Sequence, residues 1–215
     1  MQAKSELNKI FAEACICQKP GITCTQLKHT IMLNRNFFFS YVHQHLFGTI
    51  KQTQVDGLNS ILDEWEANYA KKDDRWLAYM LATTYHETDK KMQPIEEYGK
   101  GKTRPYGKPD PVTGKAYYGR GYVQLTWKYN YEAMGKIVKD DLVNHPELAL
   151  RLDYATKILF YGMMNGTFTG RKLSAYFNAT TEDWKNARRI INGLDKASMI
   201  ADYGHSFYAA ISYTT

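Results

Sequence analysis

Three carboxyl side chains, in two groups about ten residues apart, are the first candidates for chemistry in this sequence. Glu87 ends a stretch whose apolar residues have helical spacing, and Glu96 and Glu97 follow Pro94. The negative end of a helix dipole and burial both disfavour a charged carboxylate, so we expect a raised pKa for Glu87, which suits a general acid. A turn at Pro94 lets a second carboxylate face it. Two carboxyl groups across a cleft are the minimal apparatus of a glycosidase.

The same three glutamates could equally be ordinary surface residues that are exposed to solvent. A glutamate at the end of a helix is commonly exposed, and adjacent acids on a surface turn usually face water. On these residues alone, both interpretations stay open.

The segment 118–127 (YGRGYVQLTW) combines glycines with polar and aromatic side chains. Its glycines permit close approach of the backbone, and Tyr118, Gln124 and Thr126 offer hydrogen bonds to a sugar. Arg120, between two of the glycines, is a further candidate for substrate binding. A plain hairpin with packed aromatics explains the pattern equally well. A nucleotide site is a poor fit, because the Lys-Ser/Thr ending of a phosphate loop is missing and the segment opens no βαβ unit.

Five further side chains need an interpretation. Asn130 and Asn192 are amide candidates for substrate binding, although Asn192 could equally cap a helix. Arg188 and Arg189 lie on a predicted helix of core residues, so we expect one to be buried against a carboxylate and the other to be exposed. His86, beside the candidate acid, is more simply a structural residue than a metal ligand.

The three cysteines, Cys15, Cys17 and Cys24, lie close together near the N-terminus. An odd, clustered set makes a poor disulfide framework. His29 lies nearby, but a Cys-x-Cys spacing is not that of usual zinc ligands, so free thiols are favoured over a metal site. We expect the chemistry to need no metal and no cofactor.

Apolar periodicity predicts a mainly helical domain around one irregular segment. The predicted helices cover about 36–48, 53–65, 74–87, 134–138, 145–166, 181–193 and 196–211. The predicted N-caps are Thr53, Asp73 or Asp74, and Asp195. Gly193 is predicted to end a helix at its C-terminus. Between these helices, Gly99–Gly121 holds six of the 15 glycines and three of the six prolines. We therefore expect a long loop there, with small strands or a short hairpin at 117–125.

The composition is that of an ordinary globular chain with one strongly basic segment. Of the 215 residues, 44% are hydrophobic and 23% charged, which excludes global disorder. The net charge is +6, and Gly99–Lys128 alone carries seven basic residues and one acidic residue. Such a segment attracts a phosphate or carboxylate polymer, which leaves nucleic acid, an anionic membrane or an acidic cell-wall glycan as partners.

The N-terminal part predicts neither a membrane anchor nor secretion. No apolar run approaches the roughly 18 residues of a membrane span. Glu13 interrupts the apolar stretch Ile10–Cys17, and no small-residue cleavage site follows it. We expect the protein to be made in, and at first kept in, the cytosol. Residues 1–35 are predicted to be an extension, and residues 36–215 the functional domain.

Motifs in a fixed order resemble phage endolysins of the glycoside hydrolase family 19 (chitinase-like) superfamily. The resemblance covers about residues 36–215, and its start is similar in Phe37-Phe38-Phe39, Leu46-Phe47-Gly48 and Gln54-Val55-Asp56-Gly57. The four principal motifs are Tyr85-His86-Glu87-Thr88, Met92–Gly99, Tyr117–Trp127 and Arg189-Ile190-Ile191-Asn192-Gly193. This resemblance implies a bilobed, mainly α (α+β) lysozyme-like fold with a cleft beside the Gly/Pro-rich loop.

The resemblance also implies roles for single residues. Glu87 would be the general acid, a second Glu the base, and a Ser/Thr hydroxyl would hold the water of an inverting hydrolysis. Glu97 matches the family's Glu before Tyr-Gly better than Glu96 does, and Thr126 matches the hydroxyl position. Gln124 matches the substrate amide, and the Asn of the Ile-Asn-Gly motif corresponds to Asn192. The chitinase loop that carries the second Glu is longer and differently built, so Glu97 is assigned either as the base or as a binding group.

The expected function is that of a muramidase-type endolysin, a monomer that cleaves the peptidoglycan glycan strand and lyses bacteria. A chitinase, and a non-catalytic wall-binding or virion structural protein, are the alternatives. Nucleic-acid binding is disfavoured because no recognisable module occurs, and no stable membrane insertion is expected. An endolysin of this kind would accumulate in the host cytoplasm and reach the wall after another protein has permeabilised the membrane.

Overall fold

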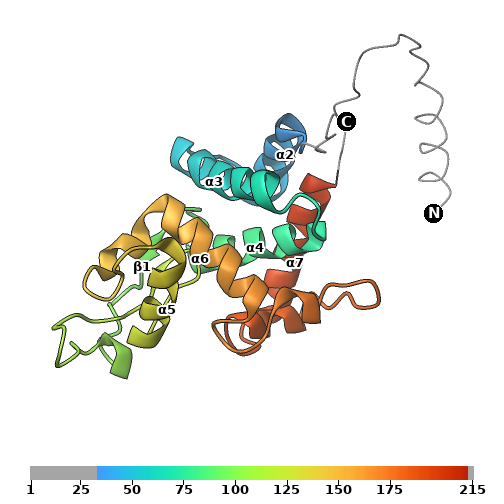
Figure 1. The fold of residues 1–215 in the computed structure, drawn as a ribbon. Coiled ribbons are helices and arrows are strands. Elements are labelled where there is room, and N and C mark those ends of the chain that lie inside the picture. Colours follow the sequence, from blue (N-terminus) through green and yellow to red (C-terminus); the bar gives the residue numbers. More distant parts are fainter. Residues whose placement is uncertain (1–32, 213–215) are drawn as a thin grey trace, which may run out of the picture. The chain divides into compact units, whose positions relative to one another are not determined.

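The computed structural model describes residues 33–212, which form a mostly helical domain with one very small sheet (Figure 1). The α-helices are α2 (Arg35–Val42), α3 (Gln52–Asn68), α4 (Asp74–Glu87), α5 (Lys128–Val138), α6 (Leu152–Asn165) and α7 (Ala197–Ile211). The two strands are β1 (Ile95–Glu96) and β2 (Arg120–Gly121). The expected fold class, mainly α with a long Gly/Pro-rich loop or a small hairpin, is confirmed, and the small sheet pairs β1 with β2 across that loop. The three cysteines, His29 and nearly all of the predicted extension lie outside the described residues.

Helix α4 is the centre of the core, and it ends at the candidate acid. All nine residues from Leu77 to Tyr85 are buried, so this helix is enclosed on every side, as a core helix of a larger domain is. Helix α7 packs along it (Figure 1). Asp73 caps its N-terminus by accepting a hydrogen bond from the backbone N–H of Arg75 at 3.0 Å, which confirms one of the two predicted caps.

The elements before α4 follow the apolar pattern closely. Helix α2 continues into a π-helical turn, η1 (His43–Phe47), and ends at Gly48 with φ of 68°, as predicted. Helix α3 buries one face, which carries Leu58, Ile61, Leu62 and Trp65. The prediction of Thr53 as its N-cap is wrong, because the helix already starts at Gln52 and Lys51 takes the N-cap position. The Gln54 side chain accepts the Lys51 N–H at 2.8 Å.

Helix α5 begins at Lys128, well before the predicted 134, and three other predicted helix boundaries after the loop are wrong for local reasons. Residues 145–166 form a short 3-10 helix, η3 (Pro146–Leu150), and then α6, because Arg151 adopts an extended conformation between them. Residues 181–193 form only the 3-10 helix η5 (Asn186–Ile190), and Gly193 is not left-handed. Helix α7 begins after Lys196 (φ 58°), which shows no side-chain cap, so Asp195 is not its cap.

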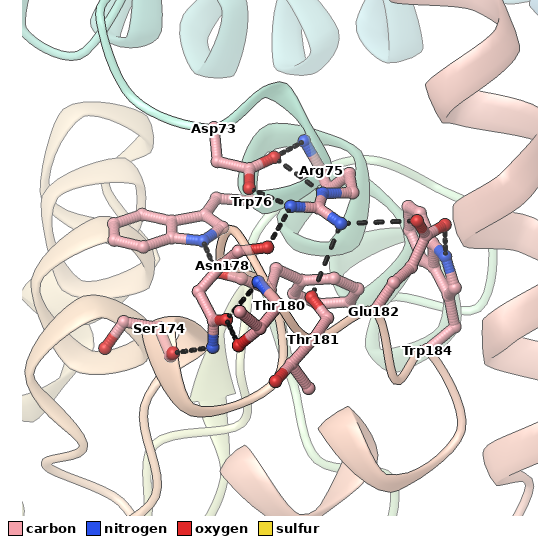
Figure 2. Close-up of polar contacts among 10 residues, drawn as sticks. Asp73, Arg75, Trp76, Ser174, Asn178, Thr180, Thr181, Glu182 and Trp184 are labelled. Carbon is pink, nitrogen blue, oxygen red and sulfur yellow. Dashed lines mark hydrogen bonds and ion pairs between the residues drawn. The ribbon is translucent and has the colours of Figure 1, made fainter.

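Arg75 ties the start of α4 to the segment that precedes η5 (Figure 2). Its guanidinium donates to Asp73 at 2.5 Å, to the carbonyl of Asn178 at 2.8 Å and to Glu182 at 3.2 Å. Trp76 adds a bond from its indole N–H to the carbonyl of Phe177 at 3.0 Å. These contacts hold residues 177–182 against the N-terminus of the helix whose other end carries Glu87.

Within the described range, no helix is both long and apolar enough to cross a membrane.

Candidate active site

One cavity of about 520 Å³ collects five of the eight predicted site residues, Glu87, Glu97, Gln124, Thr126 and Asn192. The other residues that line it are Arg104, Tyr106, Gly119, Val123 and Ile191. A hollow of similar size, about 550 Å³, is lined by α3 and α6 and holds none of the predicted residues. The residue chemistry therefore selects the first cavity as the candidate active site.

Glu87 enters the cavity from the end of α4 and is held by an arginine from a distant segment. Its Oε1 accepts a hydrogen bond from Nη1 of Arg188 at 2.5 Å. Arg188 lies on η5, is 4% exposed, and also donates from Nε to the carbonyl of Asp195 at 3.2 Å. Arg189 is exposed, so the predicted division of roles between the two arginines is confirmed. A buried guanidinium with two partners fixes the direction of the Glu87 carboxyl group.

The chain turns sharply after Glu87, and Thr88 stabilises the turn. The fully buried Thr88 hydroxyl donates to the carbonyl of Thr84 at 2.6 Å and accepts the N–H of Met92 at 3.1 Å. Asp89, Lys90 and Met92 all have positive φ values, between 50° and 63°. Left-handed conformations of non-glycine residues are strained and persist only where their surroundings hold them. The turn therefore leads the chain from the end of α4 directly into β1.

Strand β1 separates the two adjacent glutamates. Neighbouring side chains of a strand point to opposite faces. Glu97, just after β1, lines the cavity, where Oε1 accepts the hydroxyl of Tyr106 and Oε2 the N–H of Gly119, both at 3.0 Å. Glu96 does not line the cavity and accepts the hydroxyl of Tyr118 at 2.6 Å. That hydrogen bond, followed by the contacts of Lys100, lowers the pKa of Glu96.

Gln124 and Thr126 lie on the turn that follows β2 (Arg120–Gly121). Strand β2 pairs antiparallel with β1, which brings this turn beside Glu97. Gln124 has φ of 52°, and its Nε2 donates to the carbonyls of Ile95 and Gly121, each at 3.2 Å. A Cβ at Gly119 would lie 2.8 Å from Oε1 of Gln124 and 3.2 Å from Cβ of Glu97. A side chain at position 119 would therefore displace the end of the Gln124 side chain.

Three predicted binding residues do not line the cavity but hold the backbone that does. The Arg120 guanidinium is turned inward, where it lies 3.7 Å from the ring centre of Tyr118 and donates to the Tyr131 hydroxyl at 3.0 Å. The hydroxyl of Tyr118 is used by Glu96. Asn130 is buried and donates from Nδ2 to the carbonyl of Thr126 at 2.9 Å. A direct contact of these three with substrate stays a prediction.

The sequence analysis missed Arg104 and Tyr106 as cavity residues. Both lie in the irregular loop, where no periodicity relates them to Glu97. Of the seven basic residues in Gly99–Lys128, only Arg104 lines the cavity. Among the described residues there is no group of three or more His, Cys, Asp or Glu side chains that could hold a metal ion.

Comparison with protein families gives a match over the centre of the chain. The family model described as chitinase class I matches residues 67–187. An endochitinase of Arabidopsis thaliana is 38% identical over 90 residues, which cover 41% of this chain and 30% of that protein. Chitinase 3 of Oryza sativa is 35% identical over 89 residues, which cover 34% of this chain and 28% of that protein. The chain thus spans less than a third of the length of these relatives.

Solved structures share the fold over most of the chain. Chitinase C from Streptomyces griseus superimposes with a TM-score of 0.57 and 22% identity, covering 86% of this chain and 95% of that one. A class IV chitinase from Zea mays has a TM-score of 0.54 and 20% identity, covering 81% and 90%. At these identities the likeness establishes the fold and no more.

Proposed function

This chain belongs to the chitinase class I family of glycoside hydrolases, family 19, and we propose that it hydrolyses β-1,4 bonds between N-acetyl sugars in the glycan strands of peptidoglycan. One observation carries the proposal: two carboxyl groups from separate elements, Glu87 at the end of α4 and Glu97 after β1, line the same cavity. Paired carboxyl groups across a cavity supply the acid and the base of glycoside hydrolysis.

The proposed reaction inverts the anomeric carbon in one step. Protonated Glu87 donates its proton to the glycosidic oxygen as the bond to the anomeric carbon breaks. A water held by Thr126 attacks from the opposite face, and Glu97 takes its proton. Each oxygen of Glu97 accepts one hydrogen bond from the protein and keeps a second lone pair for the water. Inversion requires the two carboxyl groups to lie roughly 6.5–9.5 Å apart, to leave room for the water.

The exposed charges of the irregular loop favour an acidic wall polymer as substrate. Lys102, Arg104, Lys108 and Lys115 are exposed, and none has an ion-pair partner among the described residues. Chitin carries no charge, whereas the peptides attached to the glycan strands of peptidoglycan carry free carboxylates. Excess cations beside the cavity raise the local concentration of a polyanion but not of a neutral polymer.

Chitin is the second candidate, because relatives that match this chain are named an endochitinase and a chitinase. Mass spectrometry of the products released from purified peptidoglycan and from chitin oligomers decides between the two, since the new reducing-end sugar identifies the bond. Muropeptide release supports the proposal, whereas turnover of chitin oligomers alone would assign a chitinase. Binding to sacculi without release of reducing ends would point to a non-catalytic wall-binding or virion protein.

Glu87→Gln tests the catalytic assignment directly. Loss of a general acid should lower the rate by about 100-fold or more, with the melting temperature nearly unchanged. Glu96→Gln is the matched control, since Glu96 is the neighbour of the proposed base in the sequence but lies outside the cavity. Wild-type turnover by Glu87→Gln would overturn the assignment.

The route to the substrate is also part of the proposal. We propose that the enzyme acts as a monomer, as a phage endolysin made in the host cytoplasm, and that a separate membrane-lesion protein gives it access to the wall. Expression in the cytosol should then leave cells intact until the membrane is permeabilised. Lysis without permeabilisation would contradict this route.

A further inference from the structure

The sequence contains two Asn-Gly pairs, and one of them lies at the candidate active site. Asn192 lines the cavity together with Glu87, and Gly193 follows it in the segment between η5 and α7. The second pair, Asn165-Gly166, ends α6 and does not line that cavity. An asparagine before glycine is especially prone to lose ammonia, because glycine has no Cβ to hinder the approach of its backbone nitrogen to the asparagine side chain. The two pairs thus have the same local chemistry in different surroundings.

The fold brings the two reacting groups of Asn192-Gly193 together. The Gly193 N–H donates to Oδ1 of Asn192 at 2.8 Å, so the side-chain carbon bonded to that oxygen lies next to the Gly193 nitrogen. Within residues 33–212 this is the one hydrogen bond of the Gly193 N–H, and the pair belongs to no helix or strand. Both residues are exposed to water. The nitrogen can therefore lose its proton to solvent and reach the amide carbon without any local unfolding.

The second pair is held in a geometry that opposes the same reaction. The Gly166 N–H donates to the carbonyl of Gly162 at 3.0 Å as part of the C-terminal cap of α6, where Gly166 has φ of 74°. The Asn165 side chain turns back along its helix and donates from Nδ2 to the carbonyl of Tyr161 at 2.9 Å. Reaction at this pair has to break both hydrogen bonds first. The fold therefore exposes one Asn-Gly pair to the reaction and protects the other.

We propose that Asn192 is a site of spontaneous deamidation, by which the protein modifies its own candidate active site. The deprotonated Gly193 nitrogen forms a bond to Cγ of Asn192, and the bond from Cγ to the amide nitrogen breaks, which releases ammonia. Water then opens the resulting five-membered imide. Opening at Cγ gives aspartate, and opening at the main-chain carbonyl carbon gives isoaspartate, in which the backbone runs through the side chain. The net reaction consumes a water molecule, releases ammonia and needs no oxidant or reductant.

Both products change the cavity. Each replaces an amide, which can donate hydrogen bonds, by a carboxylate that only accepts them, and adds a negative charge near Glu87 and Glu97. A further negative charge favours the protonated form of Glu97, which the proposed reaction needs as an ionised base. Isoaspartate also adds a methylene group to the backbone between η5, which carries Arg188, and α7. Activity should decline as Asn192 is converted; this consequence rests on the proposed function, whereas the modification does not.

Peptide mapping of the full-length protein by mass spectrometry tests the modification without any assay of activity. Wild type and Gly193→Ala are incubated at mildly alkaline pH, and the peptides with Asn192 and Asn165 are compared for the mass gain of an amide that has become a carboxyl group. Alanine fits at 193, because its Cβ would meet no atom within 4 Å beyond the adjoining residues and φ is not positive. Asn192 should convert about tenfold or more faster than Asn165, and Gly193→Ala should slow the conversion of Asn192 by a similar factor.

The denatured chain is the control for the role of the fold. In concentrated urea both pairs lose their surroundings, so they should convert at similar rates. Equal rates in the folded protein, or an Asn192 that stays intact, would overturn the site.

The rate of glycan hydrolysis is measured on the same samples. It should decline in step with conversion in the wild type and persist in Gly193→Ala. Full activity of the converted wild type would overturn the effect on the cavity. A fresh enzyme that releases nothing from peptidoglycan or chitin would defeat the proposed function, while the mass gain at Asn192 would still establish the modification.

Discussion

At the scale of single residues, the space next to the proposed base is as important as its charge. Gly119 supplies an N–H to Glu97, and the absence of a side chain leaves room for Gln124. In Gly119→Ala, the end of the Gln124 side chain has to move, because a Cβ would lie 2.8 Å from its Oε1. We expect the rate of glycan hydrolysis to fall by about tenfold or more with little change in melting temperature, because small misplacements of positioning groups are costly.

A double-mutant cycle checks the mechanism of that loss. If the added methyl group acts through Gln124, Gly119→Ala should cost much less in a Gln124→Ala background than in the wild type. Additive losses would mean that the methyl group acts elsewhere, for example on Glu97, whose Cβ is 3.2 Å from the added atom.

Arg188 is the positioning residue for the proposed acid. Lysine in its place keeps the charge but loses the fork that contacts Glu87 and the carbonyl of Asp195 together. Arg188→Lys should lower kcat by about 10- to 100-fold with KM nearly unchanged, because the acid is misplaced while the binding residues are not. The neighbouring exposed residue provides the control, Arg189→Lys. A loss of stability with unaltered kcat would show that Arg188 is only structural.

At the scale of elements, the turn after α4 depends on one hydroxyl group. Thr88→Val keeps the shape of the side chain but leaves the buried N–H of Met92 without its partner. Such a loss should lower the free energy of unfolding by about 1–3 kcal/mol, measured by urea denaturation. Thr88→Ser retains the hydroxyl and should be closer to wild type. Equal stability of the valine and serine variants would contradict the role of the hydrogen bonds.

The other end of α4 should give stability a dependence on acid pH. Burial raises the pKa of Asp73, but the hydrogen bonds and charge of Arg75 outweigh burial, and the pKa lies below its usual value. A lowered folded-state pKa contributes stability above the unfolded pKa of about 3.9, and this contribution is lost as pH falls through the folded-state pKa. Asp73→Asn should therefore flatten the decline of unfolding free energy below about pH 4. Asp202→Asn, at an exposed site, is the control, and an unchanged decline in Asp73→Asn would refute the linkage.

Helices whose boundaries are set by their own local sequence could be predicted, whereas those set by other contacts could not. The helix over 74–87 was predicted because Leu77, Leu81 and Tyr85 repeat at helical spacing and Asp73 precedes them. The prediction of a helix over 181–193 was wrong: the Asp183 carboxylate accepts the backbone N–H and the side-chain amide of Asn186, and only the 3-10 helix η5 (Asn186–Ile190) follows. No periodic pattern contains such a bond.

The same distinction applies to the site. Motifs placed Glu87, Gln124 and Asn192 in one cavity without knowledge of the fold. Arg120 belongs to a motif but turns inward, and its orientation depends on packing against distant Tyr131. Tyr106 reaches the cavity through a loop whose course is set by long-range bonds, such as the one from the N–H of Tyr117 to its carbonyl. Sequence spacing does not contain that information.

At the scale of the whole molecule, the basic segment Gly99–Lys128 presents fewer unpaired, exposed cations than its composition suggests. Within Gly99–Lys128, Lys100 pairs with Glu96, Lys128 pairs with Asp110, and Arg120 is 5% exposed. The remaining four cations, Lys102, Arg104, Lys108 and Lys115, are exposed on one loop beside the cavity. Within this segment, these four are the exposed cations without an ion-pair partner among the described residues.

Because these cations attract only a charged substrate, we expect added salt to affect the hydrolysis of an acidic polymer and not that of a neutral one. Attraction between exposed charges falls as the Debye length shortens from about 10 Å at 0.1 M to about 3 Å at 1 M salt. Hydrolysis of intact sacculi should therefore slow with added salt, whereas hydrolysis of neutral chitin oligomers should not.

Lys102→Ala/Lys115→Ala removes two of the four charges without touching the cavity, and it should reduce the low-salt rate on sacculi by about two- to fivefold and leave the 1 M rate unchanged. Lys71→Ala/Lys172→Ala, which removes two exposed lysines outside the loop, is the matched control. If both double variants show the same salt profile, the loop charges do not guide the substrate, and the preference for an acidic polymer loses its electrostatic basis.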